Sequence, residues 1–206
     1  MDANGVIVVL REMARRMEAE KGFLTDLDNV IADGDHGINM ARGFAAVEEK
    51  LPGLEGKDVG MILKTVGMTL VSAVGGSAGP LYGTAFLKAG LAMTDRTEIS
   101  LDDFLTCLRA SVEGVQQRGR AVRGEKTMLD AMIPALDAMM DARKSGRDEK
   151  TVLSAGIAAA HGGVEFTKTI AATKGRASYI GERSIGHQDP GATSFAFLLE
   201  SIAVCL

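Results

Sequence analysis

The sequence is poor in the residues that β-sheets favour. Of its 206 residues none is Trp, two are Tyr and seven are Phe, so aromatic residues make up only 4%. Sheets prefer β-branched and aromatic residues, whereas Ala, Leu and Met suit close-packed helices. No pair of alternating segments joined by a hairpin turn is present. The composition therefore predicts an all-α fold.

Cysteine, excess charge and long apolar runs are also scarce. Cys107 and Cys205 lie in apolar helical patterns and are expected to be buried free thiols of a reducing compartment. The net charge of −4 argues against nucleic acid as a partner. No apolar run approaches the roughly 18 residues of a membrane helix, and the N-terminal segment has no signal-peptide pattern. We expect a cytoplasmic protein that binds neither nucleic acid nor membrane.

Helical periodicity recurs along the chain without a linker-like interruption. Apolar residues repeat at spacings of three and four, which is typical of amphipathic helices. The pattern predicts helices over 6–21, around 62–73, over 101–115, over 129–140 with a bend or break near Pro134, over 149–172 and over 192–206. A single domain spanning residues 1–206 is therefore expected.

Glycine is concentrated in four short segments between these helices. They read DGDHG, GGSAGPLYG, RGRAVRGEKT and TKGRASYIGERSIGHQDPG. The last spans about twenty residues with little periodicity, and structureless loops of that length tend to be functional. Four such loops among amphipathic helices predict one helical bundle with a site at its rim.

Three aspartates are crowded into the first of these segments. Asp33 and Asp35 flank Gly34, so a tight turn can aim both carboxylates at one point, and Asp28 could reach it from the preceding helix. Such a trio needs neutralising cations, and carboxylate oxygens suit Mg²⁺, two ions of which could share them. The alternative is that Asp33 or Asp35 merely caps the helix beginning near Gly37. An EF-hand is excluded because Phe44, not Glu, stands twelfth from Asp33.

The second and third glycine segments differ in their suitability for phosphate. Residues 72–84 run into a helix, and their small side chains let backbone N–H groups approach an anion, although close helix packing would explain them equally well. Residues 119–127 fail the Walker pattern, because Glu125 intervenes between Gly124 and Lys126. No dinucleotide-binding glycine motif opens a βαβ unit either.

The last segment adds Lys174, Arg176 and Arg183 and then leads into a helix. Asp189 as N-cap with Pro190 at the first helical position is a favourable helix start. Arg176 is either a surface charge or a clamp on phosphoryl oxygens.

The three histidines differ in what their positions predict. His36 follows the aspartates directly and is expected near a ligand. His161 lies in an Ala-rich helix and is expected to pack or to face solvent. His187 is expected to order the segment GHQDPG by hydrogen bonding.

Taken together, four motifs resemble those of the L subunit family of bacterial dihydroxyacetone kinases: LDNVIADGDHGINMARGF, GMTLVSAVGGSAGPLYGT, RGRAVRGEKTM and KGRASYIGERSIGHQDPGATS. The resemblance implies a closed barrel of about eight antiparallel helices with a nucleotide, ADP or ATP, and two Mg²⁺ ions at one end. It also implies metal ligands at Asp28, Asp33 and Asp35 and nucleotide contacts at His36, Gly37, Ile38, Asn39, Ser77, Ala78, Gly119, Met128, Arg176, Asp189, Pro190 and Gly191, with Arg176 as the catalytic residue.

The resemblance further implies that the chain is one subunit of a phosphotransferase. The chain is too short to include a second domain that holds a triose, so it resembles the phosphotransferase-system-dependent enzyme. There, bound ADP is phosphorylated by a phosphohistidine on a carrier M subunit and passes the group to dihydroxyacetone on a K subunit. The alternatives are an ATP-dependent kinase of a triose or of a tetrose such as erythrulose, and a nucleotide- or lipid-binding regulator. Dimerisation of the chain itself stays open.

Overall fold

The computed structural model covers residues 1–206 and contains helices but no strands. A bridge between Asp2 and Glu98 is isolated. None of the helices combines the length and hydropathy that a membrane span requires. The all-α prediction is confirmed, and the elements are α1 (Ala3–Ala19), α2 (Lys21–Ile31), α3 (His36–Lys50), η1 (Leu51–Leu54), α4 (Val59–Ala73), α5 (Ala78–Ala92), α6 (Leu101–Gly119), α7 (Leu129–Lys144), α8 (Glu149–Thr167), η2 (Arg176–Ser184) and α9 (Pro190–Val204).

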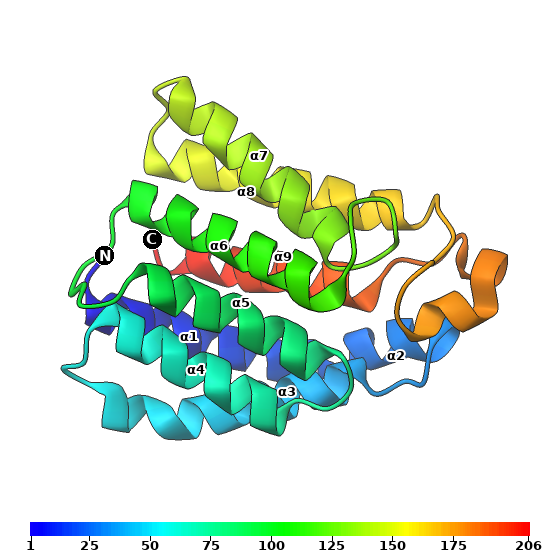
Figure 1. Ribbon diagram of the computed structural model, residues 1–206, viewed down its shortest axis with the longest axis horizontal. Helices are drawn as coiled ribbons and strands as arrows, with labels where there is room; N and C mark the ends of the chain where they lie inside the picture. Colours follow the sequence, from blue (N-terminus) through cyan, green and yellow to red (C-terminus); the bar gives the residue numbers. More distant parts are fainter.

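Eight of the helices form a closed antiparallel ring, shown in Figure 1. Around it each helix packs on the next in the order α1, α3, α4, α5, α6, α7, α8, α9, and α9 returns to α1. The helix α2 lies at the right-hand end, where it packs on α3, α9 and η2. Because neighbours alternate in direction, α3, α5, α7 and α9 all begin at this end, and both chain termini lie at the other.

The predicted apolar stripes form the inside of the ring. One cluster of 46 buried residues joins all eight helices, and Ile62, Val66 and Leu70 are at most 1% exposed. The helix α7 runs unbroken through Pro134, which corrects the predicted break. Pro134, the sixth residue of α7, removes the hydrogen bond to the Asp130 carbonyl, but the packing of α7 on α8 and α9 keeps the helix continuous. The helix α8 ends at Thr167, five residues earlier than expected.

Both cysteines are free, as predicted, but only one of them is buried. Cys107 faces the core, where burial raises the pKa of its thiol to about 12. Cys205 is partly exposed at the end of α9, so its predicted burial is wrong.

Glycines inside helices bring α4 and α5 into close contact. A Cβ on Gly67 would lie 2.8 Å from the carbonyl oxygen of Gly83, and one on Gly83 would lie 2.8 Å from that of Gly67. Gly60 and Gly90 form the same kind of pair two turns along. No side chain fits at such separations, so these glycines set how closely the helices approach, although glycine weakens a helix by itself.

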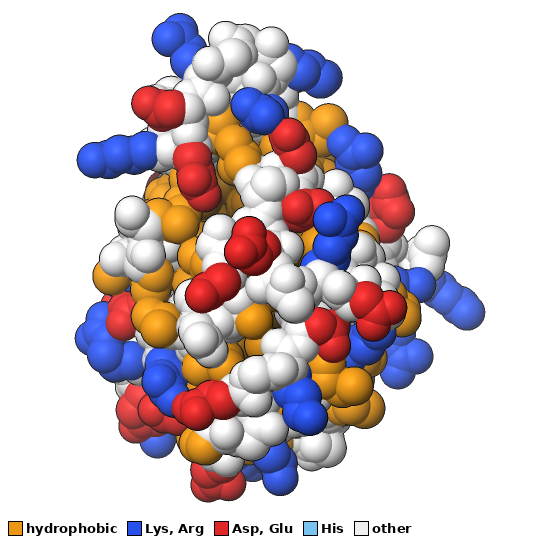
Figure 2. Space-filling model, turned by 90° about the vertical axis from the view of Figure 1, so that its left-hand side faces the viewer, with side chains coloured by type: hydrophobic (Ala, Val, Ile, Leu, Met, Phe, Trp, Pro, Cys, Tyr) orange, Lys and Arg blue, Asp and Glu red, His pale blue; other side chains and the backbone are white.

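An apolar cavity lies at the end of the ring where the chain termini meet. It measures about 180 Å³ and is lined by side chains of α1, α6 and α9 among others. Hydrophobic side chains are visible in a hollow on this end face in Figure 2. The residues of the four glycine-rich segments lie at the opposite end.

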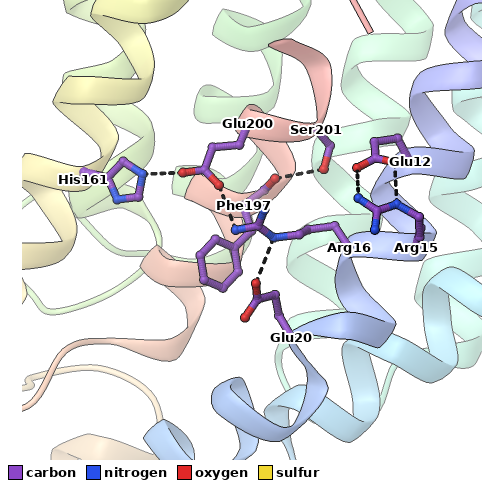
Figure 3. Close-up of polar contacts among 8 residues, drawn as sticks. All are labelled: Glu12, Arg15, Arg16, Glu20, His161, Phe197, Glu200 and Ser201. Carbon is purple, nitrogen blue, oxygen red and sulfur yellow. Dashed lines mark hydrogen bonds and ion pairs between the residues drawn. The ribbon is translucent and has the colours of Figure 1, made fainter. Parts of the chain in front are cut away.

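A network of charges closes the ring where α9 meets α1 and α8 (Figure 3). The Arg16 guanidinium of α1 donates to Glu200 at 2.9 Å, lies 3.2 Å from a Glu20 oxygen and sits 4.5 Å above the Phe197 ring. Glu200 is also 2.6 Å from the His161 ring of α8. The side chains of Arg16 and Glu200 are only about a quarter exposed, so Glu200 joins three helices in partly desolvated surroundings.

We expect Glu200→Gln to lower the free energy of unfolding by about 1–2 kcal/mol, because Arg16 would keep its burial and lose its strongest charge partner. Urea denaturation measures the change. Glu165→Gln is the matched control, since the Glu165 side chain is 67% exposed and pairs with Lys168 at the surface. That variant should lose less than about 0.5 kcal/mol. Equal losses in the two variants would contradict a special role for Glu200.

Candidate functional site

A polar cavity of about 360 Å³ lies at the end of the ring where α3, α5, α7 and α9 begin. All four glycine-rich segments contribute to it. The predicted site residues on its wall are Asp28, Asp33, Asp35, His36, Asn39, Ser77, Ala78, Gly119, Met128, Arg176, Asp189, Pro190 and Gly191. Residues up to 163 positions apart in the sequence therefore share one cavity.

The three aspartates converge at the start of α3. Asp28 is on the last turn of α2, as predicted, and Asp33 and Asp35 flank Gly34 in the turn that follows. Gly34 has φ +70°, and a Cβ there would fall 1.9 Å from the side-chain oxygen of Asn29. One oxygen from each carboxylate lies within 4.8 Å of the others. Three oxygen ligands at this spacing suit a hard cation such as Mg²⁺.

The capping alternative is wrong for Asp33 and Asp35. The residue in the N-cap position of α3 is Asp35, but its side chain makes no capping hydrogen bond. Instead Asp28 accepts from the backbone N–H groups of Asp35 and His36, at 2.8 and 3.1 Å, through the same oxygen. Asp28 therefore caps α3 and keeps its second oxygen for another partner.

Burial and mutual repulsion act on this trio. Burial raises the pKa of the Asp28 carboxyl, and the charges of Asp33 and Asp35 act in the same direction, while the two backbone donors lower it. Asp33 has one cationic neighbour, Arg176, whose Nε lies 3.1 Å from its carboxylate. One arginine against three carboxylates leaves excess negative charge, which a bound divalent cation would neutralise.

The segment 75–78 faces the aspartates from the start of α5. Gly76 has φ +63°, and a Cβ there would lie 4.0 Å from Asp35 Oδ1. The Ser77 side chain does not cap α5, so the first N–H groups of that helix have no side-chain acceptor. Free N–H groups and the helix dipole favour an anion at this place. A phosphate here would lie beside the aspartates, so a metal ion could join the two.

Basic side chains lie on the rim of the same cavity. Arg176 and Lys174 come from the segment between α8 and α9, and Arg118 comes from the last turn of α6. Part of the segment that was expected to be structureless forms the helix η2, which begins at Arg176. Three cations around an anion site complement the charge that a nucleotide's phosphates would bring.

His36 is partly buried and uncharged at neutral pH. Its Nε2 lies 2.9 Å from Ser194 Oγ, which in turn lies 2.7 Å from the Tyr82 hydroxyl, so the three side chains join α3, α9 and α5. Burial lowers the pKa of His36 to about 4, and burial raises that of Tyr82. His36 therefore reaches the cavity wall as a neutral group and brings no positive charge to it.

Asp189 caps α9, as predicted, from inside the protein. Its carboxylate accepts from Ala192 N at 2.7 Å, and the residue is 9% exposed. Burial raises its pKa to about 7; the Ala192 N–H opposes this shift, and the nearby Asp130 adds to it. The site thus contains a carboxyl group that changes charge near neutral pH.

Two predicted contacts lie off the cavity wall. Gly37 packs against α2, where a Cβ would fall 2.1 Å from the Lys21 carbonyl oxygen, and Ile38 is 47% exposed. Gly37 therefore fixes how α2 meets α3. Among the histidines outside the site, His161 pairs with Glu200, and His187 orders its segment through its backbone carbonyl, which Lys126 binds.

Several cavity residues were not predicted as site residues. They include Gly75, Gly76, Tyr82, Arg118 and Lys126. Gly75 and Gly76 belong to a segment that the sequence had already marked. Tyr82, Arg118 and Lys126 also belong to marked segments, but their residue types gave no individual signal, and only the packing of the ring brings them to the cavity wall.

The chain belongs to the DAK2 domain family, whose pattern matches residues 30–204. It is 45% identical over 185 residues to the PEP-dependent dihydroxyacetone kinase, ADP-binding subunit DhaL, of Escherichia coli, covering 90% of this chain and 88% of that protein. It is 43% identical over 195 residues to the corresponding PTS-dependent subunit of Lactococcus lactis, covering 94% and 92%. The resemblance inferred from the four motifs is confirmed.

More distant relatives share the fold within longer chains. The L-erythrulose 1-kinase of Mycolicibacterium smegmatis is 30% identical over 202 residues, and the match covers 35% of that protein. The crystal structure of the dihydroxyacetone kinase of C. freundii superposes on 98% of this chain with a TM-score of 0.76 at 23% identity, and this chain spans 34% of it. Another structure of that enzyme, in complex with AMP-PNP and Mg²⁺, gives 0.74. The helical barrel is therefore a shared fold.

The raised pKa of Asp189 predicts a pH-dependent stability in the absence of nucleotide and metal. The folded value of about 7 exceeds the ordinary 3.8, so the folded state binds this proton more tightly and loses stability as the pH rises from about 4 to 7. Asn caps helices as well as Asp does and does not titrate. The difference in unfolding free energy, wild type minus Asp189→Asn, should therefore fall by roughly 2–4 kcal/mol across this range.

Urea denaturation at several pH values between 4 and 7.5 measures this difference. The depressed pKa of His36 changes stability in the opposite direction, but it does so in both proteins and cancels in the subtraction. A difference that stays constant with pH would show that Asp189 is charged throughout.

Proposed function

We propose that this chain is the ADP- and Mg²⁺-binding subunit of a phosphoenolpyruvate-dependent dihydroxyacetone kinase. A phosphohistidine carrier subunit, M, would phosphorylate the bound ADP, and the group would pass to dihydroxyacetone held on a K subunit. The observation that carries the proposal is the meeting of three carboxylates, one arginine and an uncapped helix N-terminus in one cavity. Relatives named as ADP-binding subunits of this kinase, matched over about nine-tenths of both chains, support the same activity.

The site residues would have different roles, which follow from the chemistry of their side chains and backbone. Asp28, Asp33 and Asp35 would hold two Mg²⁺ ions, which neutralise charge on the β and γ phosphates. The backbone of Ser77 and Ala78 would bind phosphate oxygens at the start of α5. Met128, which is 4% exposed at the start of α7, would lie against the adenine together with Gly119 and the 189–191 turn.

His36, Gly37, Ile38 and Asn39 would position the nucleotide from the first turn of α3. His36 and Asn39 would do so from the cavity wall. Gly37 and Ile38 lie off the wall and would act through the helix backbone and its exposed side.

Arg176 is the residue we assign to catalysis. Its Nε is held 3.1 Å from Asp33, and its side chain is 63% exposed at the rim, so the guanidinium can reach both the bound phosphates and a partner's substrate. Arginine so placed stabilises the charge on a transferring phosphoryl group. The exposure of the rim fits a site that must open toward two partner subunits in turn.

The second candidate is the nucleotide-binding subunit of an ATP-dependent triose or tetrose kinase. The erythrulose kinases of Mycolicibacterium smegmatis contain a domain like this chain, at 30% and 32% identity. The chain would work in the cytoplasm as one domain in either case, and a homodimer is compatible with both candidates. The two candidates differ in the phosphoryl donor, which is a phosphohistidine carrier in the first and free ATP in the second.

Asp33→Asn should abolish phosphoryl transfer and weaken ADP retention in the presence of Mg²⁺, because it removes a charge from the ligand trio. The helical content, measured by circular dichroism, should stay near that of wild type. Asp26→Asn is the matched control, since Asp26 is exposed on α2 and does not line the cavity. Unchanged turnover in the Asp33 variant would remove the metal assignment.

Reconstitution with candidate K and carrier subunits distinguishes the two donors. With phosphoenolpyruvate and the general phosphotransferase proteins, dihydroxyacetone phosphate should form without added ATP, and this chain should keep its ADP through purification. Formation of product from free ATP alone, with rapid nucleotide exchange, would favour the second candidate. Product formation when this chain is left out would contradict both.

A further inference from the structure

Lys126 is a buried cation that the proposed phosphoryl transfer does not use. It is 1% exposed, and its backbone has φ +60°. Its Nζ donates to the carbonyl oxygens of Thr167 at 2.6 Å, Ser184 at 2.7 Å, His187 at 2.5 Å and Ile170 at 3.3 Å. An ammonium group has three protons, and these carbonyls account for all of them. Lys126 therefore cannot serve as a phosphate-binding lysine of the Walker kind.

The four carbonyls come from the two ends of one segment. Thr167 and Ile170 lie where the chain leaves α8, and Ser184 and His187 lie just before α9 begins. Between them, residues 171–183 carry Lys174 and Arg176 to the cavity wall, where Arg176 contacts Asp33. The ammonium thus ties both ends of the Arg176 segment to the loop between α6 and α7.

Neutral hydrogen bonds strengthen the same closure. Ala172 N donates to Ser184 Oγ at 2.9 Å, and Gly186 N donates to the Lys168 carbonyl oxygen at 2.7 Å. A charged donor forms stronger bonds than these neutral ones, and its removal would leave four carbonyls without their cation. Burial lowers the pKa of Lys126, while the charges of Asp189 and Asp130 oppose that shift.

We propose that Lys126 is a positioning residue that holds the 168–188 segment closed and so sets the place of Arg176 over the phosphates. Lys126 also lines the cavity, two residues before Met128, which would contact the nucleotide. The inference rests on the proposed function for its catalytic consequence, but the closure itself can be measured on this chain alone.

Limited trypsin digestion measures the closure. The segment contains cleavable bonds after Lys174, Arg176 and Arg183. Lys126→Met should be cut there at least about tenfold faster than wild type, because local opening exposes the backbone. Val152→Ala is the control: Val152 is fully buried on α8, so this variant loses core packing without touching the segment. Mass spectrometry of the fragments locates the cuts.

A double-mutant cycle in the reconstituted kinase measures the consequence for catalysis. Lys126→Met should lower the transfer rate by about 100-fold, the effect of misplacing a catalytic group by about 1 Å. In an Arg176→Ala background the same change should alter the rate by less than about threefold, because the group that Lys126 positions is already gone. A purely structural lysine would give additive losses.

The outcomes separate the two proposals. If wild type transfers phosphate and Lys126→Met behaves like Val152→Ala in both assays, the inference is overturned and the proposed function stands. If wild type is inactive with every donor, the proposed function fails. Trypsin digestion then still tests whether Lys126 holds the 168–188 segment closed. Lys126→Gln, which keeps a neutral donor, serves if the Met variant does not fold and should be cut at an intermediate rate. If neither variant folds, Lys126 is required for folding, and the positioning role is overturned.

Discussion

The site depends on the alternation of helix direction around a closed ring. Four helices, α3, α5, α7 and α9, begin at one end because their ring neighbours run the other way. Each helix start brings unpaired N–H groups and the positive end of a dipole, so an anion is favoured locally at these starts, although the four neighbouring helices end here with unpaired carbonyl groups. The aspartates would repel an anion there, and a divalent cation resolves the conflict by binding to both.

The four helix starts are not all capped in the same way, and the difference indicates which of them would bind phosphate. Asp28 and Asp189 cap α3 and α9 with buried carboxylates. At the start of α7, the buried Asp130 binds the backbone N–H of Thr127 at 2.8 Å. No side chain caps α5 or α7, and of these two starts only the Gly-rich one of α5 has no carboxylate bound to the adjacent backbone, so phosphate would bind there. Anion affinity is thereby directed to one helix of the four.

Buried charges at this end mostly contact backbone rather than one another. Lys126 binds four carbonyls, whereas Asp28, Asp130 and Asp189 each accept from backbone N–H groups. A buried charge is tolerated when hydrogen bonds satisfy it, and these bonds also order the loops that carry them. The loops at the rim of the barrel lack the regular backbone hydrogen bonds of a helix or a sheet. Hydrogen bonds to buried charged side chains order these loops instead.

Local sequence patterns specify the all-helical class, the apolar stripes, the caps at Asp189 and Pro190 and the three aspartates, because each depends on neighbours within a few residues. They misplace the end of α8 and predict that α7 bends or breaks at Pro134, since tertiary packing outweighs local propensity at helix ends and at proline. Long-range packing is what makes Asp28 the cap of α3, brings Arg176 to Asp33 across 143 positions and turns Lys126 inward. Those contacts join distant segments, and closing the ring is what brings them together.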